Sequence, residues 1–206
     1  QAEGEAIIRI EPTSLTINQS DSVADARDGA LVPVLKGAKS APQAEPFLNM
    51  LQSDGNRLDV RLATPSMFVE EKKENSDTYK VIHLGRYNGE LPPGQPNLPA
   101  IRKYVYVPKG KSANFEVVVG KSVEFTNYLV YPTQLPQWDT VGAETPPFYR
   151  DEGVYSTDEW LPKEMVTLGP VQIIRGHAIQ LLSICPFQYN PFRRILRVFP
   201  EINAQI

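Results

Sequence analysis

The chain has 206 residues, enough for one sizeable domain with an appendage, and its net charge of −3 gives no electrostatic case for binding nucleic acid or an anionic membrane surface. No apolar run approaches the roughly 20 residues that a membrane-spanning helix needs, so no membrane span is predicted. The 19 prolines spread along the chain disfavour long helices.

Residues 1–56 differ in composition from the rest of the chain, being small, polar and interrupted by prolines, and they are predicted to form a partly irregular N-terminal extension. The chain begins at Gln1 without a methionine, which indicates a processed or recombinant product, from which a secretory signal can have been removed. The stretch "PFLNMLQSDG", residues 46–55, is expected to make one or two helical turns that end at Gly55.

From Arg57 onward the pattern changes to β-strand. "LDVRLA", residues 58–63, alternates apolar and charged side chains, as a half-buried strand does. "SMFVEEKK" and "TYKVIHLG", residues 66–73 and 78–85, flank the turn-forming tetrapeptide "ENSD" and predict a hairpin. The proline-rich section "ELPPGQPNLP", residues 90–99, cannot hold a regular element.

Further strand segments follow to the end of the chain, and Tyr189-Asn190-Pro191 is expected to form the turn of the last hairpin. Short strands at regular spacing, with almost no helical periodicity, predict that residues 57–206 form an all-β domain. The predicted fold is an antiparallel β-sandwich, jelly-roll-like, with little helix. The later strand segments are "AIRKYVYVP", "NFEVVVGKSVEF", "TNYLVYP", "EMVTLGPVQIIRG", "HAIQLLSICPFQYNP" and "RILRVFPEI".

The residues that could carry enzyme chemistry are few. Cys185 is the only cysteine, and its apolar neighbours indicate a small buried residue. His83 and His177 have no recognisable catalytic context, and two histidines with one cysteine argue against a zinc site. The sequence has no GxSxG, HExxH or CxxC motif, so we predict no enzyme, no cofactor and no metal site. A calcium site at Asp151 and Asp158 stays open as an alternative.

Three segments together resemble the gingipain propeptides. "GQPNLPAIRKYVYVPKGKSANFEVVV", residues 94–119, is similar to the core of that family, in which a Gly-x-Pro-x-x-Pro turn leads into two strands. "RGHAIQLLSICPFQYNPFRRILRVFPEI", residues 175–202, resembles the closing hairpin of the family. "PPFYRDEGVYSTDEWLPKEMVTLG", residues 146–169, resembles the segment between them, and order and spacing agree across residues 57–206.

The resemblance implies a function. Gingipains are secreted bacterial cysteine peptidases with a caspase-like catalytic domain. Their propeptide is a β-sandwich that assists folding of the peptidase and keeps it latent with an extended loop in the active-site cleft. The expected partner is therefore a cognate caspase-like cysteine peptidase domain. The expected location is secreted, periplasmic or on the cell surface, and the chain itself is expected to be an inhibitory, folding-assisting domain of a zymogen and no enzyme.

The resemblance also identifies an inhibitory loop, residues 132–147. In the family, the loop residue that enters the cleft lies eight positions before the proline of the Val/Ile-Pro-aromatic motif, which is Pro147 here, and seven after the proline that ends the preceding strand, which is Pro132. Both counts give Asp139, where the family has arginine or lysine. An acidic residue at that position implies an aspartate-specific peptidase. The residues expected to contact the peptidase are Leu135, Pro136, Gln137, Trp138, Asp139 and Thr140.

Two other interpretations remain open. Asp139 can instead form an Asx-turn within a proline-rich surface loop, with Trp138 covering an edge of the sandwich. Alternatively, the domain is a non-catalytic β-sandwich module that binds carbohydrate or a cell-surface partner, because such folds host many functions. In that case Trp160, Tyr155 and Tyr149 are the candidates for stacking on sugar rings.

Overall fold

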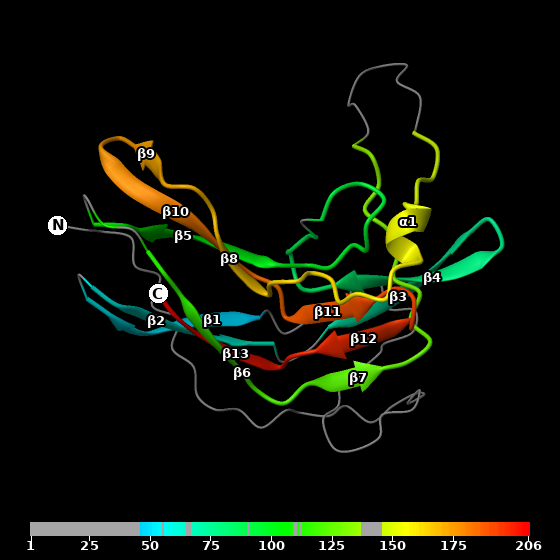
Figure 1. The fold of residues 1–206 in the computed structure, drawn as a ribbon, viewed down its shortest axis with the longest axis horizontal. Helices are drawn as coiled ribbons and strands as arrows, with labels where there is room; N and C mark the ends of the chain where they lie inside the picture. Colours follow the sequence, from blue (N-terminus) through cyan, green and yellow to red (C-terminus); the bar gives the residue numbers. More distant parts are fainter. Residues whose placement is uncertain are drawn as a thin grey trace.

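The computed structural model describes residues 46–54, 56–64, 67–89, 91–108, 111, 113–136 and 146–206. Regular structure in these residues is almost entirely β-strand, with one helix of four residues (Figure 1). In chain order the elements are β1 (Phe47–Ser53), β2 (Leu58–Ala63), β3 (Phe68–Glu74), β4 (Asp77–His83), β5 (Ile101–Tyr106), β6 (Glu116–Val119), β7 (Val123–Phe125), α1 (Glu152–Tyr155), β8 (Val166–Leu168), β9 (Gln172–Ile174), β10 (His177–Ile184), β11 (Phe187–Asn190), β12 (Ile195–Val198) and β13 (Glu201–Gln205).

The strands are arranged in four antiparallel groups. One sheet has the order β1-β2-β13-β6, a second has the order β5-β10-β8 with β9 also paired to β10, a third has the order β11-β12-β7, and β3 pairs with β4. Side chains from the first two sheets belong to one hydrophobic core, which includes Leu62 of β2, Ile202 of β13 and Leu182 of β10. Figure 1 shows these two sheets as separate layers. The predicted antiparallel β-sandwich with little helix is therefore confirmed.

Two prolines lie where the chain leaves one sheet and enters the next. Pro186 lies between β10 and β11, and Pro200 lies between β12 and β13. Proline has no N–H to give to a strand ladder, so each one ends regular pairing at that point. The Phe199 N–H donates to the Pro186 carbonyl at 2.8 Å and holds the two breaks side by side.

The strand pattern of the sequence predicted several elements closely. β2 coincides with "LDVRLA", and its alternation places Val60 and Leu62 in the core with exposed fractions of 5% and 0%. β3 and β4 form the predicted hairpin, with Glu74 opposite Asp77 at its end. In the last hairpin, Tyr189 and Asn190 belong to β11, so the turn, residues 191–194, begins two residues later than predicted.

The prediction of helical turns in residues 46–55 is wrong. Phe47–Ser53 is strand β1, which pairs with β2 and has a bulge between Met50 and Gln52. A carboxylate oxygen of Asp54 accepts from the N–H groups of Asn56 and Arg57 at 2.8 and 2.9 Å, so the segment leads into a hairpin turn. A short apolar run is compatible with either helix or strand. Here pairing with the edge of β2 favours the strand. The sheet thus begins before the predicted boundary at residue 57, while residues 1–45 lie outside the described residues.

Cys185 is buried, as its apolar neighbours predicted, with an exposed fraction of 6%. None of the helices in the described part of the chain is long and apolar enough to cross a membrane.

Candidate functional site

The predicted inhibitory loop is carried by two limbs that rise from the same end of the body (Figure 1). The first limb comprises residues 129–136 and the second limb comprises residues 146–151. Leu135 and Pro136 belong to the first limb and are exposed, Leu135 at 44%. The other predicted contact residues, Gln137, Trp138, Asp139 and Thr140, lie outside the described residues.

The first limb is anchored on both sides. On one side it runs parallel to β4, where the Lys80 N–H donates to the Leu129 carbonyl at 2.7 Å and the Tyr131 N–H donates to the Lys80 carbonyl at 2.8 Å. On the other side the Thr133 N–H donates to the Gln95 carbonyl at 2.8 Å. The limb therefore has the bonding of an interior strand up to Thr133.

Gln134 joins the two limbs. Its Oε1 accepts from the Tyr149 N–H at 2.9 Å, and its Nε2 donates to the Tyr149 carbonyl at 3.0 Å. The same Nε2 also donates to the Pro132 carbonyl at 2.9 Å. One side chain of the first limb thus satisfies both main-chain polar groups of a residue in the second limb, as a neighbouring strand would.

Gly94 bridges the same limbs through its main chain. Its N–H donates to the Thr133 carbonyl at 2.8 Å, and its carbonyl accepts from the Asp151 N–H at 3.1 Å. The residue has φ of +87°, and a Cβ at this position would lie 2.6 Å from Cε1 of Tyr149 and 3.0 Å from the Asp151 nitrogen. Only glycine fits here without displacing the second limb. We refer to Gly94, Gln134 and Tyr149 as the clamp.

The second limb is fixed to the body by an aromatic cluster and an arginine. Phe148 packs against Tyr79 and Tyr131, with ring centroids 5.4 and 5.7 Å apart. Arg150 donates to the Tyr79 hydroxyl at 2.7 Å and to Glu152 at 2.7 Å. The hydrogen bond to Glu152 is the main cause that raises the pKa of Arg150 above its ordinary value. The guanidinium is therefore a permanent cation at the base of this limb.

The helix α1 adds a third attachment. Asp151 caps it by accepting from the Val154 N–H at 3.1 Å. Tyr155 of α1 is buried, its hydroxyl donates to the Val130 carbonyl at 2.6 Å, and burial raises its pKa well above the ordinary value. Tyr155, four residues beyond the end of the second limb, therefore bonds directly to the first limb.

The two aspartates of the open calcium alternative both have structural partners. Asp151 is the cap of α1, and Asp158 accepts from Arg193 at 2.7 and 2.8 Å and from Asn190 at 2.7 Å. Among the residues that the structure describes, no three His, Cys, Asp or Glu side chains are grouped to hold a metal ion.

The aromatic residues considered for carbohydrate stacking do not form a platform. Tyr155 is buried, with an exposed fraction of 9%, so it is wrong as a candidate for stacking on sugar rings. The ring of Trp160 is covered by the Arg197 guanidinium, 3.9 Å from the ring centroid. Tyr149 is exposed at 43%, but its main chain belongs to the clamp. A stacking surface made by these three rings is therefore absent.

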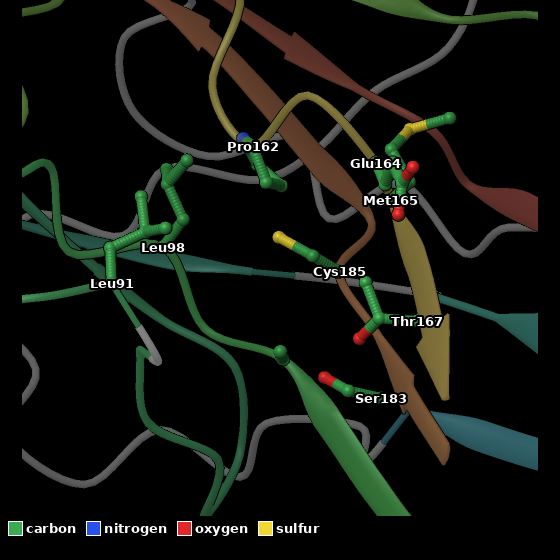
Figure 2. Close-up of a pocket in the computed structure, with 9 residues that line it drawn as sticks. Leu91, Leu98, Pro162, Glu164, Met165, Thr167, Ser183 and Cys185 are labelled. Atoms are coloured by element: carbon green, nitrogen blue, oxygen red, sulfur yellow. The ribbon is translucent and has the colours of Figure 1, made fainter. Parts of the chain in front are cut away.

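A pocket of about 180 Å³ lies beside Cys185 (Figure 2). Its walls are mostly apolar, and Glu164 is the acidic residue among them. Burial raises the pKa of the Cys185 thiol to about 12, so the thiol is protonated at neutral pH. His83 lies 3.2 Å from Glu70 and His177 packs on Tyr106, and neither lines the pocket. Among the described residues, no histidine lines this pocket to activate the thiol.

The sequence indicates the loop through Pro132 and Pro147 but gives little sign of the clamp that supports it. Gly94 was visible as a glycine between prolines, which indicated only a turn. Gln134 carried no signal, because its role depends on Tyr149, 15 residues away.

The family model Propeptide_C25 matches residues 42–206. Gingipain R1 of Porphyromonas gingivalis is 28% identical over 113 residues, which cover 55% of this chain and 11% of that protein. Gingipain R2 of the same organism is also 28% identical over 113 residues, which cover 15% of its length. The chain therefore matches only a small part of these relatives.

Two solved structures share the fold. One is the complex of the Porphyromonas gingivalis RgpB pro- and mature domains, with a TM-score of 0.68 and 22% identity over 80% of this chain and 84% of that chain. The other concerns the zymogenic latency of gingipain K from the same organism, with a TM-score of 0.60 and 20% identity over 80% of this chain and 93% of that chain.

Proposed function

The chain belongs to the Propeptide_C25 family of gingipain-type propeptides, and we propose that it keeps a peptidase of the same precursor latent. In this proposal the segment between the two limbs occupies the active-site cleft of the peptidase. The observation that carries the proposal is the clamp, in which Gln134 and Gly94 join limbs that are separately anchored to the body. A segment held at both ends loses less conformational entropy on binding, so more of its contact energy becomes affinity.

Within that function, Asp139 is proposed as the residue offered to the specificity pocket. A pocket specific for arginine or lysine has an acidic floor, against which Asp139 would be a buried like-charge contact. A pocket lined by arginines would instead bind the carboxylate through charge-assisted, bidentate hydrogen bonds. The acidic residue therefore favours an aspartate-specific peptidase.

The residues before Asp139 are proposed to fill the neighbouring subsites. Leu135 is already exposed at 44% on the first limb, so it is available for a partner. Trp138 would contribute apolar burial, because tryptophan is prominent among residues that dominate binding energy at interfaces. Pro136 would favour an extended backbone in this stretch. Gln137 and Thr140 complete the proposed contact segment on either side of Trp138 and Asp139.

The experiment measures inhibition constants for the wild type, Asp139→Ala and Asp139→Lys against the peptidase of the same precursor and, in parallel, against gingipain K. We expect Asp139→Ala to weaken inhibition of the precursor's own peptidase by about thirtyfold or more, the loss typical of a dominant interface residue. Asp139→Lys should lose inhibition of that peptidase and gain inhibition of gingipain K. Glu159→Ala, which removes an exposed negative charge elsewhere, is the matched control.

Two results would count against different parts of the proposal. If Asp139→Ala inhibits as tightly as the wild type, Asp139 is not the specificity residue. If the wild type does not inhibit its own peptidase, the latency function itself is wrong.

Assistance in folding and an extracytoplasmic location are further parts of the proposal. Refolding the denatured peptidase with and without this chain tests the first, and equal yields of active enzyme would contradict it. Fractionation of the producing bacterium tests the second, which predicts the chain in the secreted, periplasmic or surface fraction and fails if it stays in the cytoplasm.

A further inference from the structure

Gln134 bonds to the second limb in addition to the contacts that anchor each limb to the body. The main chain of the first limb is bonded to β4 and to Gln95, and the second limb is held by Phe148 and Arg150. The carboxamide of Gln134 adds a hydrogen-bonded connection between the limbs, beside the packing of Phe148 on Tyr131. Its contribution is therefore to the spacing of the limbs more than to the attachment of either one.

The Gln134 carboxamide bonds to Tyr149 in the way that the main chain of a neighbouring strand would. The Tyr149 N–H and carbonyl are both satisfied by the same carboxamide, at 2.9 and 3.0 Å. Because the two bonds are nearly equal in length and opposite in direction, they fix the position of Tyr149 relative to the first limb. The Pro132 carbonyl shares the Nε2 donor at 2.9 Å and so orients the carboxamide.

Fixing this spacing has a consequence for proteolysis. A peptidase needs its substrate to reach an extended, bound conformation, and a segment with both ends tied has fewer such conformations than a free one. If water does add across a peptide bond in the segment, giving a carboxylate and an amine, both new ends stay attached to the same body. The usual entropic gain from separating two products is then largely lost.

We propose that Gln134 is a positioning residue that makes the segment between the limbs an inhibitor instead of a substrate. It does so by fixing the spacing of the limbs before the segment is cut, while the separate anchors of the two limbs keep the cut ends on one body afterwards. This inference rests on the proposed latency function for its biological meaning, but its physical content is a property of the chain alone.

The experiment compares the wild type with Gln134→Ala and Gln134→Glu, and uses Gln172→Ala on exposed β9 as the matched control. Each chain is treated with a low concentration of chymotrypsin under native conditions, and mass spectrometry follows cleavage between residues 135 and 148. Chymotrypsin is chosen because Trp138 is one of its cleavage residues and because it is unrelated to the proposed partner.

We expect Gln134→Ala to be cut in this segment roughly fivefold faster or more, the factor that corresponds to losing two weak, partly exposed hydrogen bonds. Gln134→Glu should be accelerated similarly at neutral pH although it has the same size, because its carboxylate would face the carbonyls of Tyr149 and Pro132. Gln172→Ala should match the wild type. Thermal midpoints of the two Gln134 variants should fall by only a few degrees, since both limbs keep their other anchors.

The outcomes separate this inference from the proposed function. Equal cleavage of the wild type and Gln134→Ala, or wild-type behaviour of Gln134→Glu, would overturn the role of the carboxamide. Nicked wild type that separates into two fragments on native size-exclusion chromatography would overturn the retention of the cut ends. If the clamp variants behave as expected but no chain inhibits the precursor's peptidase, the clamp stands and the latency proposal fails.

Discussion

Replacing Gly94 with alanine tests whether the clamp is built as tightly as its contacts indicate. The left-handed backbone, with φ of +87°, costs an L-residue about 1 kcal/mol or more. The added Cβ would lie 2.6 Å from the Tyr149 ring and 3.0 Å from the Asp151 nitrogen, so the second limb must shift. That shift weakens the hydrogen bond from Asp151 to the Gly94 carbonyl, worth about 0.5–1.5 kcal/mol. With the residual overlap, the expected loss is about 2–4 kcal/mol.

Gly176 supplies a matched control for this substitution. It also has a left-handed backbone, with φ of +83°, but a Cβ at that position would meet nothing within 4 Å. Gly176→Ala should therefore lose only the backbone contribution of about 1 kcal/mol. In a domain of this size, the loss at Gly94 corresponds to a fall of about 5–15 °C in the thermal midpoint.

The assay is urea unfolding of both variants followed by tryptophan fluorescence, with thermal unfolding by calorimetry alongside. Limited proteolysis should show faster cleavage around the second limb only for Gly94→Ala. Equal destabilisation by the two substitutions would refute the reasoning, because it would mean that the close approach of the second limb to Gly94 adds nothing beyond backbone strain.

Tyr155→Phe removes the donor to the buried Val130 carbonyl and should lower the free energy of unfolding by about 1–3 kcal/mol in urea titrations; an unchanged midpoint would contradict the bond. Cys185, whose pKa is raised to about 12 by burial, should resist iodoacetamide at about pH 8 until urea is added, and rapid labelling of the native chain would contradict its burial. Hydrogen bonds from Arg193 lower the pKa of Asp158 in the folded state, so the stability they contribute is full above its unfolded pKa of about 3.9 and is lost as pH falls through the lower folded value. Asp158→Asn should therefore unfold at a lower temperature than the wild type at neutral pH but not at about pH 2, and a pH-independent difference would contradict this.

Most strands could be predicted because their signal is local. In "LDVRLA" the alternation of apolar and charged residues is enough to place Val60 and Leu62 inward, whatever the neighbouring strand is. The burial of Cys185 followed in the same way from its apolar neighbours. β1 failed because its residues have no clear period, and its structure is decided by pairing with β2.

The candidate site was predictable in outline only. The prolines at 132 and 147 marked the loop, and the clamp residues Gln134 and Tyr149 each lie two positions after one of them. The sequence could not predict the pairing of Gln134 with Tyr149, because a bond from one side chain to a distant main chain produces no periodic pattern of residues. Gly94 is farther still along the chain from both limbs, and its requirement for glycine arises only when the second limb packs over it.

The order β1-β2-β13-β6 has a consequence for synthesis of the chain. β2 and β6 both pair with β13, so residues 58–63 and 116–119 reach one sheet only through residues 201–205. A chain that emerges from a ribosome or a secretion channel in sequence order cannot close this sheet until residue 205 has come out. Until then its earlier strands present unpaired edges, so this sheet closes late in the synthesis of the chain.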